Sequence, residues 1–125
     1  MSFLLVARPF VLMNKELPEA NWIERFLLFI GKRKGFLIEG NSMLPTLKNG
    51  DAVLIAPSAK LSVGDIVLAR HPFKRSVKII KRIGTIDAQG NYFLLGDNPA
   101  ESSDSRTFGT VSVKNILGKA VCRFR

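Results

Sequence analysis

The apolar residues of this chain occur in short runs separated by turn residues, a pattern typical of β-strands. Two of the turns are predicted at Lys48–Asp51 and Asp87–Asn91. We predict strands over residues 36–38, 52–56, 65–70, 77–83, 92–95, 111–113 and 116–124. Short strands joined by turns predict a mainly β fold, an antiparallel and partly closed sheet or barrel.

One stretch before these strands has helical periodicity instead and predicts a short N-terminal helix over residues 21–31. Asn21 is placed to cap it, with Glu24 three positions on as in a capping box. Its broad apolar face consists of Trp22, Ile23, Phe26, Phe29 and Ile30, widened by Leu27 and Leu28. The face could pack on the core or a partner, or lie in a membrane interface with residues 32–34 on anionic headgroups. The shortness of the helix favours packing. We divide the chain into an N-terminal apolar and basic segment, 1–34, and a β-rich domain, 35–125.

None of the three N-terminal apolar runs predicts a membrane-spanning helix. The runs at 3–7, 10–13 and 26–30 are all far shorter than the roughly 20 apolar residues that spanning requires. A secretory signal has its basic residues before the apolar stretch, and here they follow it. We therefore expect no cleaved signal and a cytoplasmic protein, with peripheral contact to an anionic membrane surface left open.

Composition limits the chain to one domain with one core, since it has 125 residues of which 46% are hydrophobic. The net charge is +9, and residues 60–82 contain seven basic residues against Asp65 alone. Such a balance suits an acidic partner, an anionic membrane or nucleic acid. Nucleic-acid binding usually needs a platform of aromatic side chains, but Phe73 and Tyr92 stand isolated among aliphatic residues. We therefore expect no nucleic-acid partner, and a basic nucleic-acid-binding β-module stays open only as a distant alternative.

The chain contains one cysteine, Cys122, and one histidine, His71. A single cysteine cannot form an intrachain disulfide, and the two residues together cannot build a zinc site. His71 follows a predicted strand and precedes a proline, a position typical of a residue that anchors a loop. We therefore expect no metal and no cofactor.

The most distinctive turn surrounds Ser42. Gly40 and Asn41 before it tolerate unusual backbone angles, and Pro45 restricts Leu44 to extended conformations. A rigid turn can present a serine hydroxyl to a groove, as a nucleophile requires, although many ordinary turn serines have the same pattern. If Ser42 is a nucleophile, the adjacent Met43, Leu44 and Pro45 would contact the substrate.

A nucleophilic serine needs a base, and the strand 77–83 offers one in Lys81. Alternation places Lys81 on the same face as Val77, Ile79 and Ile83, so that it is the only charge there. A buried lysine loses its proton more readily and can then act as a base. In the alternative, Lys81 extends along a strand edge to reach solvent. The pattern does not decide between the two.

The polar loop 96–109 could support such a lysine. Its hydroxyls and carboxylates could form a calcium loop, an exposed loop or a support for the base. The calcium interpretation lacks regular ligand spacing. In the last interpretation Ser102 hydrogen-bonds the lysine, while Asp104 and Arg106 form an ion pair that fixes the loop.

Three stretches in order resemble the type I signal peptidases, a family of serine proteases with a Ser-Lys dyad. They are Gly40-Asn-Ser-Met-Leu-Pro-Thr-Leu47 with Lys48–Asp51, then Lys81-Arg82, then Gly96-Asp-Asn98 with Ser102, Asp104, Ser105, Arg106 and Gly109. The resemblance covers about residues 36–121. It implies Ser42 as nucleophile, Lys81 as general base, Ser102 as the residue that positions the lysine, and Asp104 and Arg106 as structural supports.

More narrowly, the chain resembles the subgroup that matures nickel-type superoxide dismutase. The resemblance rests on residues 5–9, 69–73 and 94–102, and it implies removal of a short N-terminal propeptide from the dismutase precursor. The chain departs from larger signal peptidases at 83–87 and at Gly40, where some members have a serine hydroxyl for the oxyanion. At that position only backbone N–H groups remain, including that of Ser42. Processing of secretory precursors at a membrane stays open as an alternative.

Overall fold

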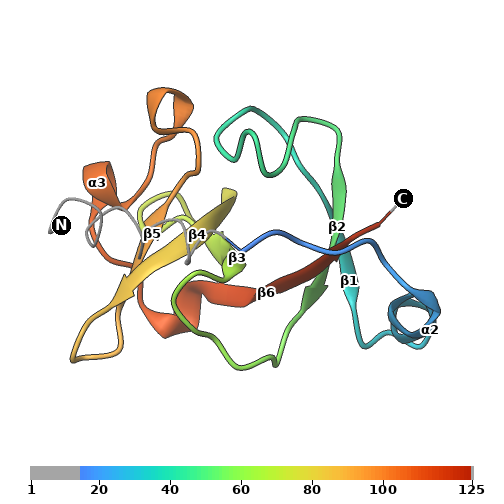
Figure 1. Cartoon of the computed structure of the whole chain (residues 1–125). Helices are drawn as coiled ribbons and strands as arrows, with labels where there is room; N and C mark the ends of the chain where they lie inside the picture. The colour runs from blue at the N-terminus through green and yellow to red at the C-terminus, as the bar shows by residue number, and fades with distance from the viewer. Residues whose placement is uncertain (1–14, 125) are drawn as a thin grey trace, which may run out of the picture.

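The computed structural model describes residues 15–124, in which six antiparallel strands form one open sheet (Figure 1). The order across the sheet is β1-β2-β6-β3-β4-β5, so β1 and β5 are the edge strands. The strands are β1 (Lys34–Leu37), β2 (Ala52–Ala56), β3 (Ile66–Arg70), β4 (Lys78–Ile86), β5 (Tyr92–Leu95) and β6 (Ile116–Arg123). The predicted mainly β, antiparallel fold is confirmed, without closure into a barrel.

Alternation along β3 gives the sheet two apolar faces. Ile66 and Leu68 belong to one buried cluster, whereas Val67 and Ala69 belong to the other. On β4, Ile80 joins the first cluster, and Ile83 the second. The first also includes Ile38, Met43, Leu47, Val53, Ile55 and Ala120; the second includes Leu94 and Val111. The turn that carries Ser42 is therefore anchored in the first cluster through Met43 and Leu47.

The helix α2 (Trp22–Phe29) lies at one end of the sheet, beside the C-terminal end of β6 (Figure 1). Asn21 caps it as predicted, since its side chain accepts a hydrogen bond from the Glu24 N–H at 2.9 Å. The Glu24 carboxylate pairs with Arg33 at 2.7 Å, so it does not complete a capping box.

The packing of α2 on the core, which its shortness favoured, is only partial, because Leu27 and Leu28 are half-buried and no residue of this helix is buried. Trp22 is 76% exposed and Phe29 86% exposed. Only one flank approaches the protein, where Arg25 lies 4.7 Å from the ring centre of Phe124. Within residues 15–124, no helix combines the length and apolar character that crossing a membrane requires. The apolar runs at 3–7 and 10–13 lie outside the described residues.

Two other segments differ from their predictions. No strand forms over 111–113: Val111 makes a single bridge to Tyr92, and a 3-10 helix, η2 (Val113–Asn115), follows. The Ser112 side chain caps η2, which favours the helical turn over continued pairing. The polar loop after β5 contains η1 (Pro99–Glu101) and α3 (Ser105–Phe108), the latter capped by Asp104.

Candidate active site

The turn that carries Ser42 is fixed from both sides. Gly40 has a φ of +84°, which favours glycine, and a cis peptide joins Leu44 to Pro45. Across the site, the Asn98 N–H donates to the Ser42 carbonyl oxygen at 2.8 Å, and the Asn98 side chain donates to the Asn41 carbonyl oxygen at 3.0 Å. The serine is therefore held by the loop that follows β5.

Lys81 is buried in the middle of β4, with only 5% of its surface exposed. The alternative in which it reaches solvent is therefore wrong. Removal from water lowers the pKa of the Lys81 ammonium, and the positive charge of Arg106 acts in the same sense. The Asp104 carboxylate opposes this shift without cancelling it. Lys81 thus has the depressed pKa that a lysine base requires.

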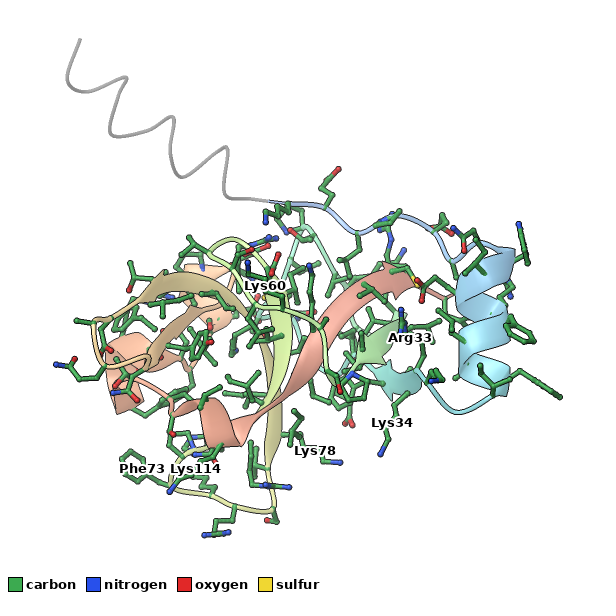
Figure 2. All side chains as sticks on the ribbon, turned by 90° about the horizontal axis from the view of Figure 1, so that it is seen from below. Arg33, Lys34, Lys60, Phe73, Lys78 and Lys114 are labelled. Carbon is green, nitrogen blue, oxygen red and sulfur yellow. The ribbon has the colours of Figure 1, made fainter. Side chains whose placement is uncertain are left out.

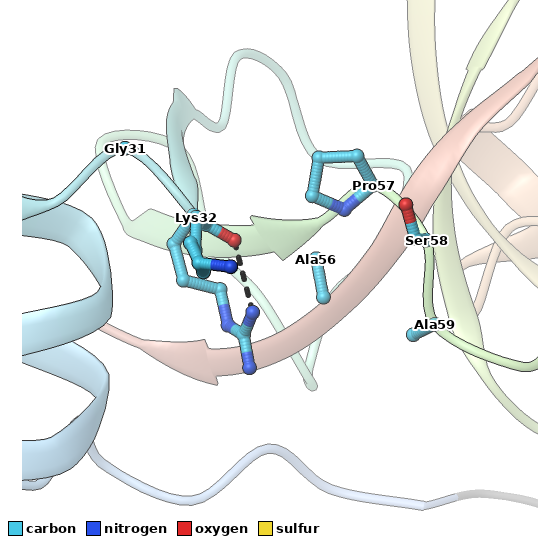
Figure 3. Close-up of a pocket in the computed structure, with 7 residues that line it drawn as sticks. Gly31, Lys32, Ala56, Pro57, Ser58 and Ala59 are labelled. Atoms are coloured by element: carbon cyan, nitrogen blue, oxygen red, sulfur yellow. Dashed lines mark hydrogen bonds between the residues drawn. The ribbon is translucent and has the colours of Figure 1, made fainter.

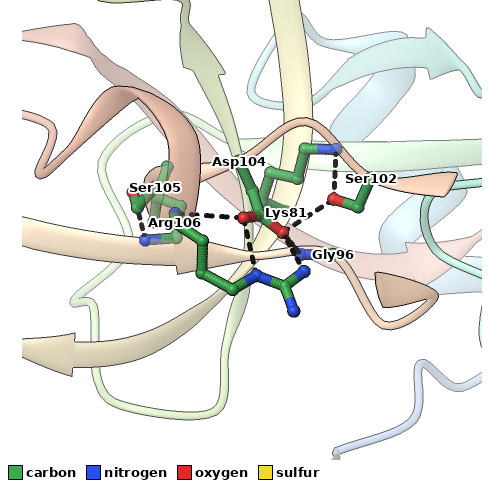
Figure 4. Close-up of polar contacts among 7 residues, drawn as sticks. Lys81, Gly96, Ser102, Asp104, Ser105 and Arg106 are labelled. Atoms are coloured by element: carbon green, nitrogen blue, oxygen red, sulfur yellow. Dashed lines mark hydrogen bonds and ion pairs between the residues drawn. The ribbon is translucent and has the colours of Figure 1, made fainter. Parts of the chain in front are cut away.

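A chain of hydrogen bonds orients the lysine (Figure 4). Lys81 Nζ donates to Ser102 Oγ at 3.1 Å, and Ser102 Oγ donates to Asp104 Oδ2 at 2.8 Å. Because an ionised carboxylate only accepts hydrogen bonds, the Ser102 hydroxyl must donate its hydrogen bond to Asp104 and accept one from the lysine. Neutral Lys81 would then donate one N–H hydrogen bond to Ser102 and keep its lone pair for another partner.

The buried Asp104 carboxylate is held ionised by its donors. Burial by itself would raise its pKa, but the hydrogen bonds from Arg106, the Gly96 N–H and Ser102 hold the pKa of Asp104 well below its usual range. The Arg106 guanidinium meets both carboxylate oxygens, at 3.0 Å and 2.6 Å. The predicted hydrogen bond between Lys81 and Ser102 and the predicted ion pair between Asp104 and Arg106 are thus both present. Arg106 already neutralises the Asp104 carboxylate, so the loop is not arranged as a calcium site.

Gly96 brings this network close to the nucleophile turn. A Cβ atom at this position would collide with the Ser102 hydroxyl and lie 2.7 Å from the Ser42 carbonyl oxygen. Only glycine therefore lets the loop pass between the two serines. The close approach also explains why Asn98, two residues on, reaches Ser42.

Asp97, which was not among the predicted site residues, links the turn that carries Ser42 to β4, the strand of Lys81. Its carboxylate accepts two hydrogen bonds from Arg82, at 2.8 Å and 2.7 Å, and one from Thr46 Oγ1 at 2.5 Å. The side chains of both ionic partners are less than a tenth exposed. The sequence contains the Gly-Asp-Asn stretch and the basic residue Arg82, but neither indicates that the Asp97 carboxylate pairs with the Arg82 guanidinium.

Two of the predicted site residues have surroundings that the sequence did not indicate: Met43 is buried, and the Gly40 N–H is hydrogen-bonded. Met43 is 1% exposed and packs in the first apolar cluster, so its side chain anchors the turn, while contact of this residue with a substrate stays a prediction. Leu44 is half-buried and Pro45 exposed. The Gly40 N–H donates to Asn49 Oδ1 at 2.9 Å, so this donor is already engaged. Within residues 15–124, the Ser42 N–H has no such partner.

Ser42 and Lys81 line one groove of about 270 Å³. The other lining residues are Phe36, Glu39, Lys78, Ile79 and Ile80. The free edge strand β1 therefore forms one wall, and β4 forms the other. A second hollow, of about 490 Å³, lies between the loop after α2 and the end of β2, where Arg33 donates to the Lys32 carbonyl oxygen at 2.9 Å (Figure 3). Neither Ser42 nor Lys81 lines it.

Comparison with known proteins identifies the family of this chain. The family model described as "Signal peptidase, peptidase S26" matches residues 22–89 and 85–125. The chain belongs to the signal peptidase family. The matched residues include both the turn that carries Ser42 and the segment from Lys81 to Arg106. The resemblance drawn from the three sequence stretches is therefore confirmed at the level of the family.

Several known proteins are also similar to this chain. The chain is 32% identical over 112 residues to the mitochondrial ATP-independent inner membrane protease subunit 1a of Arabidopsis thaliana, covering 69% of this chain and 67% of the relative. It is 30% identical over 110 residues to the mitochondrial inner membrane protease subunit 1 of Xenopus tropicalis, covering 70% and 66%. A 44-residue match to the signal peptidase I of Buchnera aphidicola is 43% identical and covers 35% and 14%. The matches thus span about two thirds of the first two relatives.

Proposed function

We propose that the protein is a serine endopeptidase in which Ser42 is the nucleophile and Lys81 the general base. The observation that carries this proposal is the buried Lys81 with a depressed pKa, held by Ser102 in the groove that Ser42 also lines. Residues 35–125 would form the catalytic domain, with residues 1–34 preceding it. Membership of a serine peptidase family agrees with these roles.

In the proposed mechanism neutral Lys81 takes the proton from the Ser42 hydroxyl as Oγ attacks the scissile carbonyl carbon. The Ser42 N–H stabilises the oxyanion, a contribution commonly worth about 3–4 kcal/mol for one donor. Protonated Lys81 then gives its proton to the leaving amine, and the acyl group remains on Ser42. A water molecule, activated by the same lysine, hydrolyses the ester and regenerates the serine. Ser102 and Asp104 act by positioning Lys81.

The substrate is proposed to bind in an extended conformation along β1. Within residues 15–124 this strand pairs only with β2, so its other edge is available for an added strand beside the groove. Leu44 and Pro45, next to the nucleophile, are proposed to contact the residues around the scissile bond. No cofactor or metal takes part in the proposed mechanism.

The activity of the protein is expected to rise with pH. Because only neutral Lys81 can accept the serine proton, kcat/KM should increase as pH passes through the depressed pKa of this lysine, and should fall below it. The measurement is the initial rate of peptide cleavage in buffers of constant ionic strength. A flat profile from about pH 5 to 9 would argue against a lysine base.

We further propose the precursor of a nickel-type superoxide dismutase as the substrate, with loss of an N-terminal propeptide. This rests on the stretches at 69–73 and 94–102, together with residues 5–9, which the structure does not describe. The test is incubation with that precursor, followed by mass spectrometry of the new N-terminus. One defined cleavage, absent with Ser42→Ala, is the expected result. Cleavage of secretory precursors alone would instead favour signal peptidase activity at a membrane.

The exposed face of α2 favours peripheral contact with an anionic membrane over a purely cytoplasmic location. Trp22, Phe26 and Phe29 are more than half exposed, and the basic residues Lys32 and Lys34 are exposed in the segment that follows the helix. We expect the protein to sediment with vesicles that contain phosphatidylglycerol. Phe29→Ser should weaken this binding without changing peptide cleavage in solution. Equal sedimentation of the variant and the wild type would contradict the contact.

A further inference from the structure

The hairpin between β3 and β4 carries positive charges that the proposed mechanism does not use. We define the basic cluster as four hairpin residues with one residue of η2: Arg70, Lys74, Arg75, Lys78 and Lys114. Four of the five are exposed, and Arg70 is half-buried. Figure 2 shows Lys78 and Lys114 toward the same end of the molecule, with Lys60 on the opposite side in this view.

The charges of the basic cluster are not neutralised by the fold. Among residues 15–124, none of its five side chains forms an ion pair, whereas Lys15, Arg33, Arg82, Arg106, Lys119 and Arg123 all do. Arg70 also lies directly opposite Lys78 in the pairing of β3 with β4. Like charges in facing positions destabilise a sheet. The arrangement therefore lowers stability unless an anion compensates it.

The hairpin presents these charges on an ordered turn. His71 Nδ1 accepts hydrogen bonds from the N–H groups of Phe73 and Lys74, both at 3.1 Å, and the His71 ring packs 4.7 Å from the ring of Phe108. This confirms the prediction that His71 anchors a loop. Beside the turn lies a hollow of about 290 Å³ lined by Arg70, His71, Pro72, Arg75, Lys114 and Asn115, with no acidic residue.

The basic cluster is continuous with the proposed active-site groove. Lys78 belongs to the cluster and also lines the groove that contains Ser42 and Lys81. It lies three residues before Lys81 on β4, a separation of about 10 Å along a strand. An extended substrate advances about 3.3 Å per residue, so its side chains would reach the cluster within roughly three to eight residues of the scissile bond.

We propose that the basic cluster is a subsite for acidic side chains of the precursor, Asp or Glu residues on the segment that leaves the groove past Lys78. This proposal deepens the proposed peptidase function and rests on it. The cluster would add binding energy equally in the ground state and the transition state. It should therefore act on KM and leave kcat unchanged.

The test compares two peptides that span the same processing site and differ only in three distal Glu or Gln residues. For the wild type, the Glu peptide should have a roughly tenfold lower KM at low salt, and the difference should shrink as the salt concentration rises. Arg75→Glu and Lys114→Glu should each raise the KM of the Glu peptide about threefold to tenfold, with kcat unchanged. Arg75→Lys should retain most of the preference.

Lys60→Glu is the matched control, because it changes the net charge equally at an exposed site outside the cluster. It should leave both KM values as in the wild type. If Lys60→Glu raised KM as much as Arg75→Glu, the preference would come from net charge and the subsite would be overturned. The same conclusion would follow from equal KM values for the two peptides.

A binding measurement separates this inference from the proposed function. Fluorescence anisotropy with a labelled hexaglutamate peptide needs no cleavage, and Arg75→Glu should weaken that binding while Lys60→Glu does not. If the peptide binds in this way but no precursor is cleaved, the peptidase proposal fails and the acidic-peptide site stands. If a single-stranded oligonucleotide or phosphatidylglycerol vesicles bind the cluster more tightly than the peptide, its assignment to acidic peptides is overturned.

Discussion

Replacing Lys81 by methionine is expected to lower kcat/KM for precursor cleavage by at least about 10³-fold while the fold stays intact. Methionine is similar in length but cannot accept the proton of Ser42. The lysine is 5% exposed, and methionine fills a similar volume without burying an amine. Loss of activity should therefore come without loss of structure. The measurements are steady-state kinetics and the urea unfolding midpoint.

Two further variants test whether the loss of activity is specific to the pair of Ser42 and Lys81. Ser42→Ala should lose as much activity as Lys81→Met, and the double variant should lose little more than either, because the two groups act in one step. Lys60→Met removes an exposed lysine elsewhere and should leave kcat/KM unchanged. Retention of more than about a tenth of the activity by Lys81→Met would remove Lys81 from the mechanism.

Replacing Asp97 by alanine is expected to destabilise the protein by about 3–5 kcal/mol, because it leaves the Arg82 guanidinium buried without a counter-charge. Such a loss is a large share of the total stability of a domain of this size. Activity should fall as well, since Thr46 loses the acceptor that ties the nucleophile turn to β4. Urea unfolding gives the stability, and kcat/KM of the folded fraction gives the activity.

A double-mutant cycle isolates this ion pair. The Arg82→Met/Asp97→Ala variant should be less destabilised than the sum of the two single variants, because neither charge is then left alone. It should not recover fully, since Arg82 also donates to the carbonyl oxygens of Lys15 and Gly64 at 2.8 Å. Glu16→Ala, at an exposed position, should change stability by less than about 0.5 kcal/mol. Additive single effects would show that the pair is not coupled.

Lys81 and Asp97 belong to two separate sets of hydrogen bonds in one site. Lys81 and Arg82 are neighbours on β4, yet the first reaches the Ser102 hydroxyl and the second reaches Asp97. Adjacent side chains of a strand point to opposite faces, so one strand can serve both the base and the support of the nucleophile turn. The loop after β5 supplies the partner in each case. A change in this loop is therefore expected to disturb both.

The sequence by itself determined the features that depend on local chemistry. Turn residues and alternation placed β2 and β5 at their observed bounds and most other strands within a few residues. Alternation also put Lys81 among apolar neighbours, and Asn21 caps its helix as the pattern predicted. Such features could be predicted because strand faces and helix caps depend on residues close together in the chain.

Only the tertiary structure decided which distant groups meet. Thr46 and Asp97 are 51 positions apart, and no local periodicity relates them. The burial of Lys81, the engagement of the Gly40 N–H by Asn49 and the full burial of Met43 likewise depend on packing between segments. The exposure of α2 was also undecided, since an apolar helical face is the same in sequence whether the core covers it or not. The turn around Ser42 was thus predictable, whereas its support from β4 and the loop after β5 came from the fold.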